Sequence, residues 1–248
     1  MTALLQIAGL GKRFGGFTAL QEIDLEVQEG ERLGLIGPNG SGKSTLVNCI
    51  CGTLRNETGT VHFAGRALDG LAAHQRTRAG LARSFQLPRP FASLTLAENV
   101  RIPILYAANA RAGAGIGIGI GAGAIAGRCR DLLAEVGLAE KADRLPRDLT
   151  QIEMRKLELA RAMAAEPKLL FADEVMAGLS HAEVDEIIAL LIKLNGQGVT
   201  VIMIEHIMRA VMEVSQRLAV LVAGRKIADG PPKDVVRDPE VVKAYLGE

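Results

Sequence analysis

The nine residues 37–45, GPNGSGKST, constrain the fold of this chain more than any other segment. They follow the apolar segment RLGLI and precede LVNCI, in which apolar residues begin a helical pattern. Three glycines let the backbone fold closely enough for its N–H groups to point at phosphate oxygens. A helix that begins at Lys43 adds the positive end of its dipole. A strand, this loop and a helix, in that order, predict a phosphate-binding P-loop.

The P-loop predicts which side chains contact a nucleotide. We expect Lys43 to reach the β- and γ-phosphates of ATP, and we expect the hydroxyl of Ser44 to ligate Mg²⁺. The predicted nucleotide-binding residues of the loop are Gly37, Pro38, Asn39, Gly40, Ser41, Gly42, Lys43, Ser44 and Thr45.

Two adjacent carboxylates follow a second apolar strand, KLLFA at residues 168–172. Asp173 lies 130 residues after Lys43, where a carboxylate holds Mg²⁺ directly or through water. Glu174, beside the metal rather than on it, suits a general base that polarises the attacking water. The alternative is an acidic pair that caps a helix or lies in a solvated turn. The P-loop favours the catalytic interpretation.

Three further residues are candidates for the same site. His206 follows the apolar strand VTVIMI, and its imidazole can donate a hydrogen bond to the γ-phosphate. Gln86 can contact Mg²⁺ or the water, or it is a surface glutamine. Phe14 can stack on adenine, or it is a core residue.

The rest of the chain alternates between strand and helix patterns. We expect edge strands at residues 4–7 and 23–27 and a hairpin over 218–229 that turns near Gly224. Thr95-x-x-Glu98 and Ser180-x-x-Glu183 are capping boxes that begin helices, and Pro239 begins a last one. This alternation predicts an α/β fold with a parallel sheet and a helical insertion between about residues 87 and 160.

Composition excludes several other classes. The chain has 248 residues, with 29 Lys and Arg against 28 Asp and Glu and only 3% aromatic residues, which argues against a nucleic-acid partner. We expect Cys49, Cys51 and Cys129 to be reduced, buried thiols of a cytosolic protein, and the first ten residues do not predict a secretory signal. Residues 112–127, AGAGIGIGIGAGAIAG, are too short and too glycine-rich for a membrane helix and predict a mobile loop.

Taken in chain order, Phe14, GPNGSGKST, Gln86, FADE and His206 resemble the ATP-binding subunit of an ABC transporter, nearly end to end. More narrowly, the chain is similar to the branched-chain amino acid importer group. The segments that carry this narrower resemblance are KRFGGFTAL, RSFQLPRPFASLTLAENV, DEVMAGLS, IEHIMRAV and the terminal AYLGE.

The resemblance implies the fold in more detail. It is a P-loop NTPase core of the ABC ATPase type, with a parallel sheet, an antiparallel β-subdomain and an inserted helical subdomain. Residues 1–248 would form a single ABC ATP-binding domain. Residues 1–86 and 161–230 would form the nucleotide-binding core, residues 87–160 the helical subdomain and residues 231–248 the C-terminal helix.

The resemblance also implies roles and partners. Gln86 would be the Q-loop residue, residues 177–180 the D-loop and His206 the switch histidine. Two such subunits, identical or different, close head to tail on two ATP molecules, and the helical subdomain docks on membrane permease subunits. An extracellular or periplasmic binding protein takes part indirectly, and the subunit is peripheral, at the cytoplasmic face of the cell membrane.

One motif departs from the family. The LSGGQ signature, which contacts the ATP of the opposite subunit, should fall at residues 149–153, but this chain has LTQIE there. The segment Thr150-x-x-Glu153 is itself a capping box, whose helix N-terminus can still present N–H groups to a phosphate. Thr150 is therefore the one signature residue that we assign to the nucleotide of the partner.

The leading hypothesis is an ATP-hydrolysing subunit that powers import of branched-chain or related amino acids. The altered signature leaves open a nucleotide-dependent regulatory or assembly subunit with weak ATPase activity. A soluble ABC ATPase of DNA repair or translation is a third possibility, although the chain has no tandem halves, coiled-coil insertion or basic face. Urea, amides, aromatic acids or lipid export would leave the same ATPase motifs.

Overall fold

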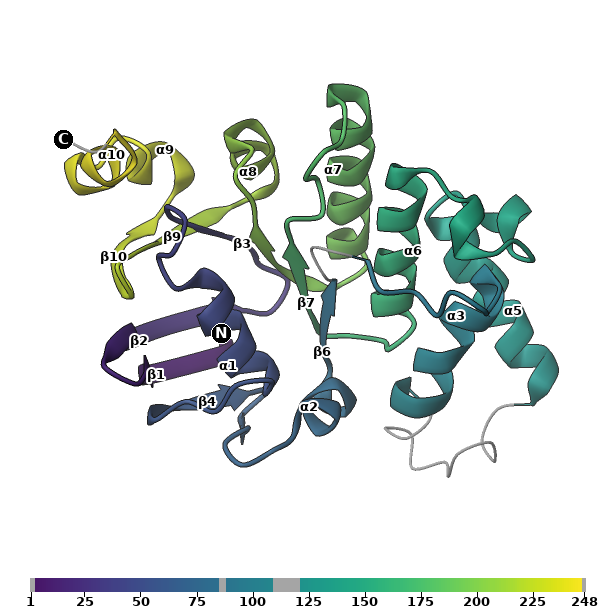
Figure 1. The fold of residues 1–248 in the computed structure, drawn as a ribbon, viewed down its shortest axis with the longest axis horizontal. Coiled ribbons are helices and arrows are strands. Elements are labelled where there is room, and N and C mark those ends of the chain that lie inside the picture. Colours follow the sequence, from purple (N-terminus) through teal and green to yellow (C-terminus); the bar gives the residue numbers. More distant parts are fainter. Residues whose placement is uncertain (1–2, 85–87, 109–120, 247–248) are drawn as a thin grey trace.

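The structure is a computed structural model that describes residues 3–84, 88–108 and 121–246. Among these residues, one sheet of six strands runs through the middle of the molecule (Figure 1). Its strands, in spatial order, are β10 (Arg225–Gly230), β9 (Arg217–Val222), β3 (Arg32–Ile36), β8 (Thr200–Ile204), β7 (Leu169–Asp173) and β6 (Leu81–Ser84). Neighbours from β9 to β6 are parallel, and β9 and β10 form the predicted hairpin.

The parallel order determines where the functional segments meet. The P-loop follows β3, Asp173 ends β7, and Glu205 and His206 follow β8. Because carboxyl ends of neighbouring parallel strands meet at one edge of a sheet, these segments lie together, where ligands bind to open α/β sheets.

A second sheet of four antiparallel strands packs beside the first. In spatial order these are β2 (Phe17–Gln28), β1 (Ala3–Phe14), β4 (Thr58–Phe63) and β5 (Arg66–Ala67). Helix α1 (Lys43–Cys51) lies against this sheet, and one core joins Leu10 and Ile23 of the sheet to Leu46 of α1 and Phe171 of β7. The β-subdomain and the P-loop helix therefore share a core.

The other helices cover the remaining faces and the side opposite the β-subdomain (Figure 1). They are α2 (Ala73–Ala79), α3 (Leu96–Pro103) with a π-helical turn (Ile104–Ala108), α5 (Ala122–Glu135), 3₁₀ turns (Ala139–Lys141 and Pro146–Asp148), α6 (Gln151–Met163), α7 (His181–Gly196), α8 (Met208–Val214), α9 (Pro232–Val235) and α10 (Pro239–Leu246). A second core joins Leu132 of α5, Leu157 of α6 and Leu191 of α7 to Val201 of β8. Among the described residues no helix is long and apolar enough to cross a membrane.

The three capping boxes are confirmed. Thr95, Thr150 and Ser180 each accept a hydrogen bond from the backbone N–H three residues later, and the Glu at that position bonds back to the cap backbone. Since capping depends on neighbours within one turn, the sequence alone was enough to predict it.

Several local expectations were wrong. Strand β1 is not an edge strand, because it pairs with β2 on one side and with β4 on the other. The predicted loop at 112–127 is helical from Ala122 onward. There the burial of Ile125, Cys129 and Leu132 offsets the cost of Gly123 and Gly127, about 1 kcal/mol each. The run before residue 121 lies outside the described residues.

The cysteines follow the prediction in part. All three are free, and Cys49 and Cys129 are buried as expected. Cys51 is half-buried, because it ends α1 at the wall of a surface hollow described below.

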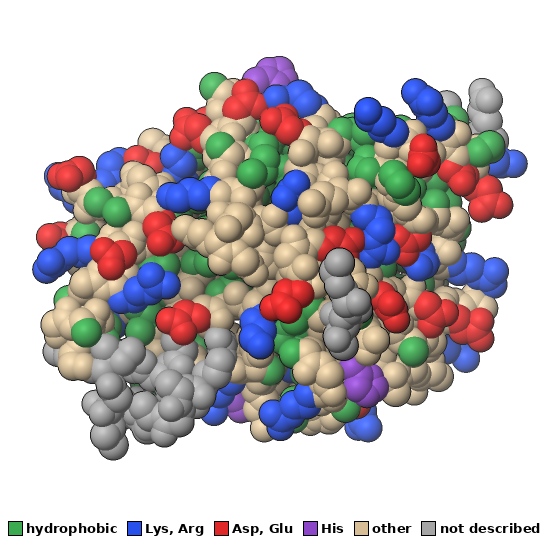
Figure 2. All heavy atoms as spheres, turned by 180° about the vertical axis from the view of Figure 1, so that it is seen from behind, with side chains coloured by type: hydrophobic (Ala, Val, Ile, Leu, Met, Phe, Trp, Pro, Cys, Tyr) green, Lys and Arg blue, Asp and Glu red, His purple; other side chains and the backbone are tan. Residues whose placement is uncertain are grey.

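The surface mixes both signs of charge. On the face opposite that of Figure 1, Lys and Arg side chains alternate with Asp and Glu (Figure 2). The near-equal numbers of acidic and basic residues, with a formal net charge of +1, agree with this mixed surface.

Candidate functional site

The P-loop is held between two backbone segments that leave no room for side chains at two of its glycines. Gly37 has φ +149°, and a Cβ there would lie 2.0 Å from the carbonyl oxygen of Leu221 in β9. Gly42 has φ +106°, and its Cβ would lie 2.8 Å from the carbonyl oxygen of Ala19 in β2. Gly42 is also the N-cap of α1. Glycine is therefore required where the loop leaves β3 and where it enters the helix.

The side chain of Lys43 forms hydrogen bonds with the P-loop itself. Its Nζ donates to the carbonyl oxygens of Gly37 at 2.7 Å and Pro38 at 3.0 Å, and to Oγ of Ser41 at 3.4 Å. Burial lowers the pKa of Lys43, and the charges of Glu174 and Asp173 oppose that shift. The ammonium group is thus fixed in the loop that a phosphate would enter.

The C-terminal helix reaches the same loop. Partial burial raises the pKa of the Tyr245 phenol on α10, and a hydrogen bond with the backbone of Gly37 opposes that shift. A contact of this helix with the P-loop was not predicted from the sequence.

A cavity of about 290 Å³ opens over the P-loop. It is lined by Phe14, Phe17, Ala19, Asn39, Gly40, Ser41, Gly42, Lys43, Ser44, Thr45, Glu174 and His206. These residues come from β1, β2, the P-loop and the ends of the two strands β7 and β8. The structure therefore brings most of the predicted site residues around one hollow.

Two exposed phenylalanines stand at the rim of this cavity. Phe14 is 48% exposed and Phe17 is 64% exposed, and they pair across the β1–β2 hairpin. Nζ of Lys12 lies 5.3 Å from the centre of the Phe14 ring. Phe14 is thus not a core residue, which was the alternative interpretation of the sequence. Phe17 was missed, although its pairing position in the hairpin was a usable signal.

Asp173 is buried at the end of β7. Its Oδ2 accepts a hydrogen bond from Nη2 of Arg83 at 2.5 Å, and Nη1 of Arg83 donates to Oδ1 of Asn48 on α1 at 2.6 Å. Arg83 was not predicted as a site residue. It lies on β6, the neighbour of β7, and only the strand pairing reveals that the two side chains meet.

Glu174 leaves the strand through a left-handed backbone turn. Its φ is +48°, and its N–H donates to the carbonyl oxygen of Ile204 at 2.9 Å. Nε2 of His206 lies 3.3 Å from its Oε1. The predicted general base and the predicted γ-phosphate ligand are therefore in direct contact.

Glu205 is a buried carboxylate that was not predicted as a site residue. Only 3% of it is exposed, and its two oxygens accept from the backbone N–H of Met176 at 2.9 Å and of His206 at 3.3 Å. Burial raises the pKa of Glu205 to about 7. Its signal in the sequence was a glutamate directly after an apolar strand.

Four of the predicted site residues that the structure describes, Gly37, Pro38, Asp173 and Thr150, are not among those that line the cavity. Gln86 lies outside the described residues. Thr150 caps α6 and is not among the residues that line the hollow, as far as the structure describes the chain. Thr150 therefore does not take part in this cavity of its own subunit, as far as the described residues show.

Comparison with known proteins decides the family. The family model described as "ABC transporter" matches residues 20–177. The chain belongs to the ABC transporter family. A second family model, described as "Branched-chain amino acid ATP-binding cassette transporter", matches residues 225–248 of this ABC protein.

Relatives extend over the whole chain. The high-affinity branched-chain amino acid transport ATP-binding protein BraF of Pseudomonas aeruginosa is 37% identical, over 99% of this chain and 98% of its own. LivG of Escherichia coli, of the same description, is 36% identical over the same shares. A crystal structure of an ATP-binding cassette of an ABC transporter, in its ADP conformation, has a TM-score of 0.87 at 30% identity, with both chains covered completely. These likenesses do not favour the regulatory or the DNA-repair alternative.

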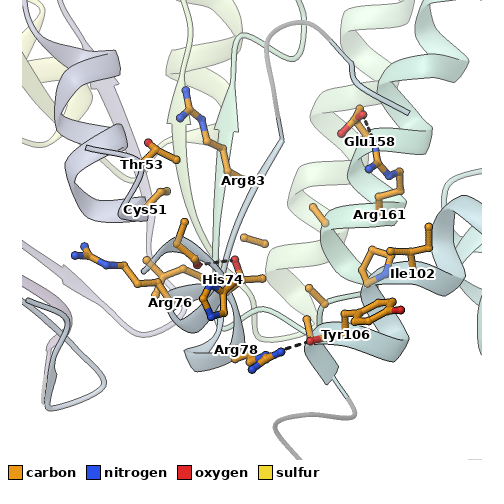
Figure 3. Close-up of a pocket in the computed structure, with 18 residues that line it drawn as sticks. Cys51, Thr53, His74, Arg76, Arg78, Arg83, Ile102, Tyr106, Glu158 and Arg161 are labelled. Carbon is orange, nitrogen blue, oxygen red and sulfur yellow. Dashed lines mark hydrogen bonds and ion pairs between the residues drawn. The ribbon is translucent and has the colours of Figure 1, made fainter. Parts of the chain in front are cut away.

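A second hollow of this ABC protein, about 570 Å³, lies between α2 and β6 on one side and α3 and α6 on the other. In Figure 3, His74 and Arg76 stand on its left, Ile102 and Tyr106 on its right. Its lining is largely apolar and includes Leu81 and Ala162. Nε of Arg78 donates to the carbonyl oxygen of Tyr106 at 3.3 Å, and both residues line the hollow.

Proposed function

We propose that this chain binds and hydrolyses ATP and thereby powers an ABC importer of branched-chain or related amino acids. The observation that carries the proposal is the contact between Glu174 and His206 at the mouth of the P-loop cavity. The amino acid class comes from the names of the relatives and from the family model at the C-terminal end.

The P-loop suits a nucleotide in its own geometry. Its backbone cradle has no room for a Cβ at Gly37 or Gly42, and Lys43 is fixed beside it. Backbone N–H groups and the start of α1 would bind the phosphates, and Lys43 would exchange its carbonyl partners for phosphate oxygens. Phe14 would stack on the adenine.

The donor set also fits Mg²⁺. Ser44 lies in the first turn of the P-loop helix and Asp173 ends β7. Hydroxyl and carboxylate oxygens are ligands that Mg²⁺ accepts. Ser44, Asp173 and Gln86 are the residues that we assign to it. When bound, the ion would neutralise charge on the phosphates during transfer.

Glu174 and His206 would act on the water and the γ-phosphate. The carboxylate of Glu174 would accept a proton from the attacking water, and the imidazole of His206 would donate a hydrogen bond to the phosphate. Their mutual contact of 3.3 Å keeps both groups at one place before a nucleotide arrives. The departing proton would thus have an acceptor next to the reacting phosphate.

We propose two kinds of partner for this subunit. We assign residues 1–86 and 161–230 to the nucleotide-binding core and residues 87–160 to a helical subdomain. The hollow between α2 and α3 would receive a short apolar segment of a membrane permease, at the cytoplasmic face of the membrane. A second ATPase subunit, identical or different, would supply its signature segment to the nucleotide held here, because Thr150 of this chain does not line its own cavity.

The test is ATP hydrolysis and amino acid uptake in vesicles that contain the permease complex. We expect leucine uptake to require ATP. The variant Glu174→Gln should hydrolyse ATP about 10²–10⁴-fold more slowly and still bind ADP within twofold of the wild type. Glu140→Gln, on an exposed 3₁₀ turn, is the matched control. A wild-type rate in Glu174→Gln would exclude Glu174 as the base, and uptake without ATP would exclude the function.

A further inference from the structure

The segment 175–179 joins the hydrolytic carboxylate Glu174 to helix α7. Its first residues, Val175 and Met176, are buried at 1% and 0% exposure. Two turns within the segment stabilise it. The N–H of Ala177 donates to the carbonyl oxygen of Glu174, and the N–H of Leu179 donates to the carbonyl oxygen of Met176. Any shift of this segment would therefore move the backbone of Glu174.

Glu205 holds the segment from one side. Oε1 of Glu205 accepts a hydrogen bond from the N–H of Met176 at 2.9 Å, and Oε2 accepts one from the N–H of His206 at 3.3 Å. One buried carboxylate thus connects the segment after Glu174 to the backbone of His206. A carboxylate that accepts two backbone N–H groups has little freedom to move.

From the other side, the segment is held by helix α6. Nε2 of Gln151 donates to the carbonyl oxygen of Ala177 at 3.2 Å, and Nη2 of Arg155 approaches the same oxygen at 3.4 Å. Gln151 and Arg155 are four residues apart and so lie on one face of the helix. Gly178 has φ +78°, and a Cβ there would lie 2.6 Å from Nε2 of Gln151. The backbone of the segment therefore lies directly against the Gln151 side chain.

We propose that Gln151, Arg155 and Glu205 are positioning residues that clamp segment 175–179 from two sides and so keep Glu174 beside His206. Gln151 stands in the altered signature segment. The departure from the family signature at this position then has a function of its own, because Gln151 links the start of α6 to the segment that follows the hydrolytic carboxylate of the same subunit. The effect on turnover rests on the proposed ATPase function, whereas the clamp itself does not.

The charges around Arg155 agree with this arrangement. The side chain is buried, and burial lowers its pKa, while the charges of Glu205, Glu158 and Glu174 oppose that shift. Arg155 thus lies in the field of both Glu205 and Glu174. It therefore carries positive charge on the α6 side of the clamp, in the field of the carboxylate on the other side.

The test uses two substitutions, one at the exposed residue Gln151 and one that keeps the side-chain shape of Glu205. Gln151→Met keeps chain length and helix propensity but removes the donor. The matched control is Lys156→Met on the same helix, whose Nζ bonds Glu186 of α7 at 2.6 Å rather than the segment. Glu205→Gln keeps an acceptor for Met176 and loses the one for His206.

The first readout is amide hydrogen exchange of the peptide 174–180 in the full chain. We expect exchange about threefold to tenfold faster in Gln151→Met and Glu205→Gln, and unchanged in Lys156→Met. The double variant should exchange more slowly than the product of the single effects, because both act on one segment. Unchanged exchange in Gln151→Met, or a strictly multiplicative double variant, overturns the clamp.

The second readout is ATP turnover in the permease complex. For Gln151→Met we expect kcat to fall about threefold to tenfold, with KM and the Kd for ADP within twofold of the wild type. A fall in kcat without faster exchange would overturn the proposed route through the segment. If the wild type hydrolyses no ATP, the proposed function fails, and exchange alone still decides the clamp.

Discussion

Nη2 of Arg83 lies 2.5 Å from Oδ2 of Asp173, and both side chains are largely buried. The same guanidinium bonds Asn48 on the P-loop helix. The carboxylate that we assign to Mg²⁺ therefore already has a fixed cation beside it, supplied by the neighbouring strand.

Removal of this cation should destabilise the fold. We expect Arg83→Met to lower the free energy of unfolding by about 2–4 kcal/mol, because Asp173 would keep a buried charge without its partner. Urea unfolding in metal-free buffer measures it. The control is Arg209→Met, whose ion pair with Asp185 is exposed and should change stability by less than about 1 kcal/mol. Equal losses in the two variants would contradict the prediction.

The buried Glu205 should make stability depend on pH. Its pKa is about 7 in the folded protein, against an ordinary value of 4.5. The folded chain therefore binds this proton more tightly than the unfolded chain. Its contribution is fully present below pH 4.5 and is lost as pH rises through 7, by about 3 kcal/mol in all. Glu205→Gln should remove this loss.

The measurement compares wild type and Glu205→Gln by urea unfolding from pH 5 to pH 8. The difference between their free energies of unfolding should change across that window, with the wild type losing stability relative to the variant. A constant difference would show that Glu205 keeps an ordinary pKa in the fold.

Two glycines of the P-loop should respond differently to the same substitution. Gly37→Ala would bring a Cβ to 2.0 Å from the carbonyl oxygen of Leu221, so the loop must move, and ADP binding should be lost. Gly40→Ala meets no atom within 4 Å and carries only the strain of its φ of +77°, about 1–2 kcal/mol. Isothermal titration with ADP measures the affinity of each variant. Equal losses of ADP affinity in the two variants would contradict the steric argument.

The exposed phenylalanines should contribute to base binding and not to phosphate binding. Phe14→Leu should weaken ADP about fivefold or more, since stacking on a base is worth about 1–3 kcal/mol. Pyrophosphate, which has no base, should bind the variant as it binds the wild type. Phe17→Leu in the same titration tests whether the second ring takes part. A parallel loss of pyrophosphate binding would indicate a disturbed loop instead.

Much of the site could be predicted because its parts are local in sequence. The P-loop needs glycines at set spacings, and the three helix caps need partners three residues away. The alternation of strands and helices also predicted the parallel sheet, whose carboxyl edge brings Lys43, Glu174 and His206 to one cavity. These inferences use only neighbours along the chain.

The sequence by itself therefore determined the fold class and predicted the P-loop and the two carboxylates, since each depends on short-range pattern. Only the tertiary structure decided what surrounds them. Arg83 meets Asp173 across 90 residues, and Gln151 meets Ala177 across 26. Such contacts depend on which strands and helices become neighbours and at what register. That choice is made by burial of the two cores as a whole, and no short pattern in the chain encodes it.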